Sequence, residues 1–343
     1  MTYFIIRITI VLLTIYNLEM KTKQIFTIAT YLLFAVLVLQ ACKKDNKPTV
    51  TLPELTTIEL TGLTIADANA GGQITNTGGK IDKFGLVWSS TNPIPEVGPG
   101  KNEGLTENLN GTLGKFTNAF SSLAGNKTYY FRAYATNGAG TAYGEIKSFV
   151  IDVDNNVYHT VKIGNQIWML ENLRTTKLND GIQIKYSPDA ASWSTAAAGA
   201  YTYYDYLPAN QITYGNLYNW HIINYNKVAP IGWHIPTLLE WQALLSYLGG
   251  LGSAGSQLKE SGNTHWLSAN SDATNASGFT ALPGGLISTS GSFVNFKLVA
   301  YFWTATQNDS ETAYFTSMDS NSGKVIQNYI NKLNGFSIRC IKD

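Results

Sequence analysis

The sequence predicts a mainly β chain whose C-terminal part also contains helix, in an α+β arrangement. Its 343 residues are enough for about two domains of ordinary size. The 20 Tyr, 8 Trp and 31 Gly are typical of short strands joined by tight turns. Only 14% of the residues are charged and the net charge is +1, so nothing indicates a nucleic-acid partner.

The first 41 residues have the composition of an export signal. Two apolar stretches, 3–18 and 25–41, are separated by a short charged segment. Read from Met20, the chain has a basic start, an apolar run and a small residue before Cys42, which is the layout of a secretory signal peptide. We therefore interpret 1–41 as a signal peptide, and we expect the part before Met20 to come from a misassigned start codon.

Cys42 is the expected lipidation site. The segment Leu39-Gln40-Ala41-Cys42 resembles the lipobox of bacterial lipoproteins, in which the Cys is lipidated and becomes the mature N-terminus. The resemblance implies an outer membrane lipoprotein, on the cell surface or the periplasmic face, with the membrane as partner and residues 42–54 as a polar tether. An uncleaved membrane anchor over 25–41 is the alternative, but 17 residues is short for a span.

Residues 55–151 are predicted to form a first domain made of strands. The segment 58–65 alternates apolar residues with polar or small ones, as a half-buried strand does. Leu123 and Tyr129, six residues apart, precede another apolar strand. This spacing resembles the tyrosine corner of the fibronectin type III fold, in which the Tyr hydroxyl ties a strand to the preceding turn. The resemblance implies a β-sandwich that serves as a spacer.

Residues 152–343 are predicted to form a second domain, which opens with an Asp- and Asn-rich boundary segment. Strand patterns over 157–169 are interrupted at Gly164, which indicates a hairpin with a two-residue turn. Thr237 and Glu240 have the spacing of a capping box and precede apolar residues at helical intervals. We therefore expect one clear helix after Thr237, and strands after it.

Six segments of the second domain, taken in order, resemble the Fibrobacter succinogenes major paralogous domain; they are 160–173, 215–220, 230–241, 278–285, 302–306 and 335–340. The resemblance implies a secreted or lipid-anchored protein with a fold related to the C-type lectin and formylglycine-generating-enzyme group. Members often carry a Cys where Ala229 stands, so Cys340 lacks that partner. We expect Cys340 to be a buried, unreactive thiol.

No catalytic or metal-binding pattern accompanies this resemblance. A lectin-type calcium site needs Glu-Pro-Asn and Trp-Asn-Asp triplets, and neither occurs. Formylglycine-generating chemistry depends on a pair of Cys, of which one remains. The four His residues show no zinc-site spacing, so we interpret them as structural. We expect no cofactor, no metal and no enzymatic activity.

Aromatic residues outside the six segments are the candidate ligand contacts. They lie in Ser-, Ala- and Gly-rich loops, where flat rings suit stacking on sugars or on protein partners. With one neighbouring His, the candidates are Trp193, Tyr201, Tyr203, Tyr204, Tyr206, His265 and Trp266. Packing of each ring in the core is the alternative, and the effect of replacement on thermal stability distinguishes the two.

These features predict a non-catalytic lipoprotein for binding or adhesion, which recognises a glycan or another protein through its C-terminal domain. Two alternatives stay open. An extracellular hydrolase acting on glycan would need a pair of acidic residues at a cleavage site. A structural subunit of a surface assembly would bind no small ligand.

Overall fold

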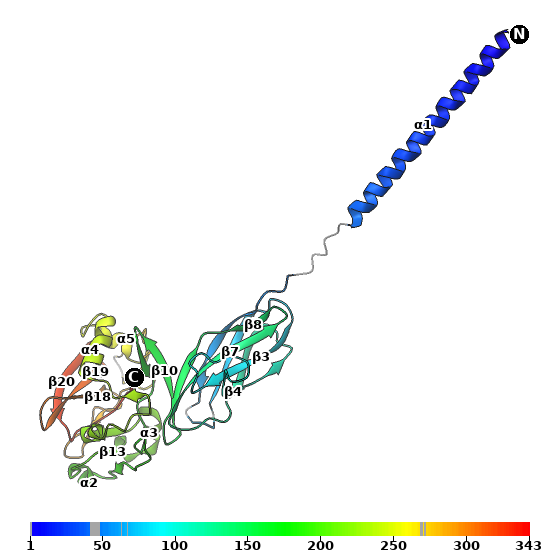
Figure 1. Cartoon of the computed structure of the whole chain (residues 1–343). Coiled ribbons are helices and arrows are strands. Elements are labelled where there is room, and N and C mark those ends of the chain that lie inside the picture. Colours follow the sequence, from blue (N-terminus) through cyan, green and yellow to red (C-terminus); the bar gives the residue numbers. More distant parts are fainter. Residues whose placement is uncertain (1, 42–48, 63, 67, 268–269, 271) are drawn as a thin grey trace. The chain divides into compact units, whose positions relative to one another are not determined.

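The computed structural model describes residues 2–41, 49–62, 64–66, 68–267, 270 and 272–343 (Figure 1). The chain divides into two compact units, Met1–Val50 and Thr51–Asp343, and each is described by itself. Cys42, the predicted lipidation site, lies outside the described residues. The second unit is mainly β with short helices in its C-terminal part, as the sequence predicts.

The first unit contains one helix, α1 (Thr2–Ala41), which includes both apolar stretches of the N-terminus. Its described side chains, from residue 7 to residue 36, are all exposed. Among the described residues, no helix combines the length and the apolarity that a membrane span requires. The signal peptide stays a prediction.

Residues 51–151 form a β-sandwich, in which two antiparallel sheets pack face to face (Figure 1). One sheet has the order β1-β2-β6 and consists of β1 (Glu54–Thr61), β2 (Asn69–Asn76) and β6 (Gly114–Ala119). The other contains β3 (Ile81–Ser89), β4 (Gly104–Leu105), β5 (Asn108–Leu109), β7 (Lys127–Asn137), β8 (Gly140–Tyr143) and β9 (Lys147–Ile151). Phe120 lies at the centre of the core, with ring centroids 5.1 to 5.3 Å from those of Trp88, Phe131 and Phe149.

Tyr129 makes the hydrogen bond that the sequence predicts for it. Its ring is buried at the start of β7, and its hydroxyl accepts a hydrogen bond from the Ala124 backbone N–H at 3.0 Å. Leu123 packs against the same core. The residue after Ala124 is Gly125, and a Cβ at this position would lie only 2.8 Å from the carbonyl oxygen of Asp152, so a side chain would not fit. The turn before β7 is therefore held against β7 by Tyr129 and packs closely against Asp152.

The predicted domain boundary is a tight hairpin turn inside a continuous sheet. β9 pairs with β10 (Val157–Ile163), so a single ten-stranded sheet includes strands from both sides of the boundary. Asp152 is buried, and its carboxylate accepts hydrogen bonds from the backbone N–H groups of Asp154 and Asn156 and from the Tyr158 hydroxyl. Burial raises the pKa of this carboxyl despite those hydrogen bonds. Asp152 is consequently an interior residue of the turn, although Asn155 in the same segment is exposed.

Side chains tie the sandwich to the C-terminal domain (residues 152–343) beyond this turn. The Trp233 indole N–H donates to the Thr128 hydroxyl at 2.8 Å, and the Asn126 amide donates to the Asn179 carbonyl at 2.7 Å. Lys342 bonds to the Tyr130 hydroxyl and lies over its ring. The two regions therefore share polar contacts as well as a sheet.

The C-terminal domain has short strands linked by long loops (Figure 1). The ten-stranded sheet continues through β11 (Gln166–Met169), β22 (Ile341–Lys342) and β15 (Trp233–His234). A six-stranded sheet contains β12 (Lys185–Tyr186), β13 (Ala200–Thr202), β14 (Leu217–Asn219), β21 (Gly335–Phe336), β16 (Leu286–Ile287) and β17 (Phe293–Val294). A third sheet contains β18 (Val299–Gln307), β19 (Thr312–Asp319) and β20 (Val325–Asn331). The helices are α2 (Ala190–Ser194), η1 (Tyr204–Tyr206), α3 (Pro208–Tyr214), η2 (Trp220–Tyr225), α4 (Leu238–Tyr247) and α5 (Ala254–Leu258).

Local predictions for this domain are confirmed at two places. β10 and β11 pair across the Gly164 turn, where Gly164 has a φ of +59°, a conformation that glycine adopts without strain. Helix α4 begins with both hydrogen bonds of the capping box between Thr237 and Glu240. Its buried face includes Trp241, which packs against Trp168.

Cys340 is buried, as predicted. It lies in the same hydrophobic cluster as Ala229, the position where related sequences often carry the second Cys. Burial raises the pKa of the thiol well above its usual range. Both properties keep it in the unreactive neutral form.

Buried cations hold the loops of the C-terminal domain. The Lys259 ammonium donates to the carbonyls of Asp319 and Ser322, at 3.0 Å each, and to the Asp272 carboxylate at 2.9 Å. Arg339 is fully buried, donates to the Asn172 side-chain oxygen at 2.8 Å, and bonds to the Phe279 carbonyl. Burial lowers the pKa of Arg339 to about 9, so the side chain still carries its charge at neutral pH.

Candidate binding site

Four of the seven predicted contact residues are buried rather than exposed. Trp193 and Trp266 have almost no exposed surface, and Tyr201 and Tyr204 are buried as well. The Trp266 indole N–H donates to the Ala281 carbonyl at 3.1 Å, inside the cluster that contains α4. In this structure the four rings are core residues: Trp193 lies in α2, Tyr201 in β13 and Tyr204 in η1, and only Trp266 lies in a loop. They cannot provide an open stacking platform.

The remaining three predicted residues are half-buried and belong to two groups of rings. Tyr203 stacks on Tyr186 with centroids 5.4 Å apart. Tyr206 and His265 lie at the two ends of a continuous row of ring contacts, with centroid separations between 4.2 and 5.8 Å, that runs Tyr206, Phe293, Tyr204, Phe296, Tyr214, His265. His265 also bonds to the Glu260 carboxylate at 2.8 Å. The rings of these side chains pack against one another, so we interpret them as packing residues, although the buried Tyr206 hydroxyl has no hydrogen-bond partner among the described residues.

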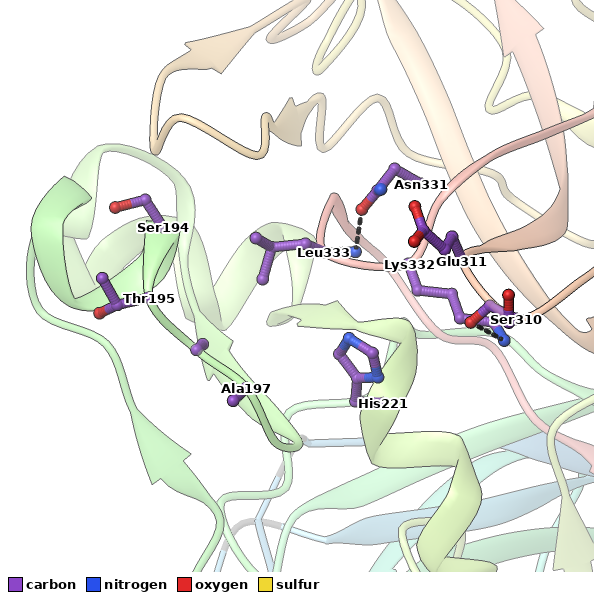
Figure 2. Close-up of a pocket in the computed structure, with 10 residues that line it drawn as sticks. Ser194, Thr195, Ala197, His221, Ser310, Glu311, Asn331, Lys332 and Leu333 are labelled. Atoms are coloured by element: carbon purple, nitrogen blue, oxygen red, sulfur yellow. Dashed lines mark hydrogen bonds between the residues drawn. The ribbon is translucent and has the colours of Figure 1, made fainter.

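An open hollow of about 370 Å³ lies beside the buried Trp193 (Figure 2). It lies within the size range of small-ligand sites. The loop after α2, the first turn of η2, the β18–β19 turn and the end of β20 line it, through Ser194, Thr195, Ala196, Ala197, His221, Ser310, Glu311, Asn331, Lys332 and Leu333. Four segments far apart in the sequence therefore meet around one polar depression.

His221 and Glu311 are, besides Lys332, the ionisable side chains that line this hollow. Figure 2 shows the His221 ring directed into the space between the loop after α2 and the turn at Lys332. Within the described part of the chain, neither the imidazole nor the Glu311 carboxylate hydrogen-bonds to another group. Burial, together with the nearby charge of Lys332, lowers the pKa of His221. At neutral pH the imidazole is thus uncharged, with one donor and one acceptor.

Lys332 is a structural cation at the floor of the hollow. Its ammonium donates to the Gln307 side-chain oxygen at 3.2 Å and to the carbonyls of Asp309 and Ser310 at 2.7 and 3.0 Å. It also lies 4.6 Å from the centroid of the Trp220 ring. All three of its donors are used, so Lys332 positions the turn that carries Glu311 and does not offer a free charge.

A second hollow, of about 420 Å³, lies on the other side of the same loop. Ala198 and Gly199 continue the loop into it, and Tyr225 at the end of η2 provides a ring that is 42% exposed. Its rim includes the ion pair between Lys227 and Asp180, with 2.8 Å between nitrogen and oxygen. Both hollows thus share the loop and η2.

No metal centre is evident in the described residues, where no three His, Cys, Asp or Glu side chains gather closely enough to hold an ion. His234, which the sequence analysis interprets as structural, bonds to side chains on both ring nitrogens. Its ring lies between two carboxylates, 2.8 Å from Glu240 and 2.6 Å from Asp343. Desolvation opposes the proton, but hydrogen bonds to both carboxylates prevail and raise the pKa of His234.

Sequence reasoning missed His221, Glu311 and Tyr225. His221 was interpreted as structural because no ligand-type spacing surrounds it, and the other two lie in segments with no distinctive pattern. They become neighbours only because η2, the loop after α2 and the third sheet fold together. The single sequence signal was the small-residue run Ala196–Gly199, which indicated an accessible loop.

Comparison with known proteins places the C-terminal domain. The family model of the Fibrobacter succinogenes major domain matches residues 161–342. No curated protein and no solved structure matches the chain at a significant level. The matched range contains β11, every helix after α1 and both hollows, and it covers more than half of the 343 residues. This chain belongs to the Fibrobacter succinogenes major domain family.

Proposed function

We propose that this chain is a non-catalytic, lipid-anchored binding protein of the outer membrane, which recognises a glycan in the first hollow of its C-terminal domain. The observation that carries the proposal is the pair His221 and Glu311, which line an open hollow and have no partner within the described chain. Sugar hydroxyls both donate and accept hydrogen bonds. A neutral imidazole, a carboxylate and the hydroxyls of Ser194 and Thr195 complement them without a metal ion.

The remaining parts of the proposal concern fold and location. The Ala124–Tyr129 hydrogen bond supports a fibronectin type III-like sandwich as the spacer. The relationship of the C-terminal domain to C-type lectins rests on sequence resemblance. Lipidation of Cys42 rests on the lipobox-like segment before it, and mass spectrometry of the membrane-extracted protein tests it directly. A mature N-terminus at Cys42 that carries acyl chains is the expected result, and an unmodified Cys42 would contradict the anchor.

Binding of purified protein, from residue 49 onward, to a glycan array tests the function. His221→Ala and Glu311→Ala should each weaken binding of a positive glycan about tenfold, because each removes a hydrogen-bonding group and one of the two is charged. The exposed Glu54 of β1 gives a matched control, Glu54→Ala, which should bind like wild type. Melting temperatures of all three variants should stay close to that of wild type, since His221 is only partly buried and Glu311 and Glu54 are exposed.

Two outcomes would overturn the proposal. Absence of binding to any glycan would favour a structural subunit. Cleavage of a glycan that is abolished in Glu311→Ala would favour the hydrolase. A calcium chelator should leave binding unchanged, because the described residues supply no metal-ligand cluster.

A further inference from the structure

The two hollows share two structural elements, the loop after α2 and helix η2. The loop after α2 lines the first with residues 194–197 and the second with Ala198 and Gly199. Helix η2 contributes His221 to the first and Tyr225, four residues later, to the second. Ala197 lines the first hollow and the next residue, Ala198, lines the second, and both are exposed and small. An extended ligand in one hollow therefore meets little obstruction on its way to the other.

Tyr225 is an exposed ring held in a fixed position. The backbone N–H of Gly199 donates to its hydroxyl at 3.3 Å. A Cβ at Gly199 would lie 2.5 Å from the ring, so only glycine lets the ring rest against this part of the loop. A ring that is already ordered loses little conformational entropy when a ligand stacks on it. Among the rings of the two hollows, Tyr225 alone combines exposure with this support.

The chemistry of the two hollows is complementary. The first offers hydrogen-bonding groups through His221 and Glu311, and the second offers a stacking surface through Tyr225. At the rim of the second, Asp180 and Lys227 pair with each other, and the exposed Lys185 adds one further charge. This division suits a ligand that repeats the same unit, with apolar ring faces and polar edges, more than it suits one compact molecule.

We propose that the ligand is a linear, neutral oligosaccharide that crosses the loop at Ala197 and Ala198, with one unit against His221 and Glu311 and another stacked on Tyr225. This inference rests on the proposed function and deepens it. The site is then one that binds internal units of the oligosaccharide, because both hollows are open to solvent and neither closes around an end of the ligand. Affinity should therefore depend on ligand length.

Length dependence is measured with an array of unbranched glucose, xylose, mannose and galactose chains of one to six units. For the series that binds, we expect affinity to rise about tenfold or more between one unit and four. Tyr225→Ala should remove most of this rise and leave the single-unit affinity unchanged, whereas Tyr225→Phe keeps the ring and should retain it. Tyr247→Ala is the matched control, since Tyr247 is an exposed ring on α4 that lines neither hollow.

Ala197→Leu tests the crossing point itself. The added bulk should lower the affinity for long chains to that for short ones, while Ala243→Leu, at an exposed position of α4, should have no effect. Suppose that Glu311→Ala weakens binding, but that oligosaccharides of all lengths bind equally and that Tyr225→Ala and Ala197→Leu change nothing. In that case the inference that the oligosaccharide crosses the loop is wrong, and the proposed function stands. If wild type binds no member of the array, both are wrong.

Discussion

The sandwich and the C-terminal domain satisfy their buried backbone groups in different ways. In the sandwich most core side chains lie on paired strands, so the sheets themselves satisfy the peptide groups around them. In the C-terminal domain, apart from β18, β19 and β20, most strands are short and alternate with loops, and buried cations such as Lys259, Lys332 and Arg339 donate to backbone carbonyls. A domain poor in long strands thus needs charged side chains inside, at the cost of desolvating them.

The largest effect should come from Trp193, a core ring in the short helix α2. Trp193→Ala should lower the free energy of unfolding by about 3 to 5 kcal/mol, as much as Phe131→Ala in the sandwich, because both side chains are fully buried. Urea denaturation of both variants gives the comparison. The half-buried Tyr203 serves as control, and Tyr203→Ala should cost clearly less. A small loss for Trp193→Ala would show that α2 opens in solution, and would restore this ring as a contact residue.

The next effect tests the buried cations. Arg339→Met should cost about 3 kcal/mol, because it leaves the Asn172 side-chain oxygen and the Phe279 carbonyl without their donor, although relief of desolvation offsets part of the loss. Arg132→Met is the matched change in the sandwich. Arg132 bonds to the Pro95 carbonyl from a partly exposed position, and we expect a cost of about 1 kcal/mol. Equal costs, measured by urea denaturation, would remove the distinction between the two regions.

A smaller effect is expected where the two regions join. Asp152→Ala should cost about 2 kcal/mol, because the N–H groups of Asp154 and Asn156 and the Tyr158 hydroxyl lose their acceptor. Native wild-type protein should resist proteases at this turn, and the variant should be cut there. Asp152→Asn keeps an oxygen acceptor and should be less affected. Rapid cleavage of the wild type at the turn would identify it as an open linker instead.

The smallest effect is a pH dependence of the C-terminal domain. The folded state raises the pKa of His234 above its usual 6.5, so it holds this proton more tightly than the unfolded chain. The resulting stabilisation is complete below the unfolded pKa and is lost as the pH rises through the folded pKa. Melting temperature should therefore fall in wild type as the pH rises above the usual His pKa of 6.5, and fall less in His234→Gln. Identical slopes for the two proteins would contradict this assignment.

Sequence reasoning succeeded where a few neighbouring residues decide the structure. The Gly164 turn, the capping box of α4 and the spacing of Leu123 and Tyr129 are patterns of this kind. It failed for the burial of Trp193 and Trp266, because the composition of a loop does not tell what the loop folds against. The same limit applies to Arg339, whose partner Asn172 is 167 residues away in the sequence. The candidate site could not be predicted for the same reason, since four separate segments supply its residues.

The shared sheet also decides how the protein responds to pulling. In a protein held at its N-terminus and bound to a ligand at its other end, tension passes from the sandwich to the C-terminal domain through the β9–β10 ladder and the contact between Trp233 and Thr128. A flexible linker at this point would lengthen and absorb the motion of the ligand. The turn at the buried Asp152 cannot lengthen in this way, because hydrogen bonds to the Asp152 carboxylate hold it closed. The unit from Thr51 to Asp343 should therefore transmit the tension as one stiff body.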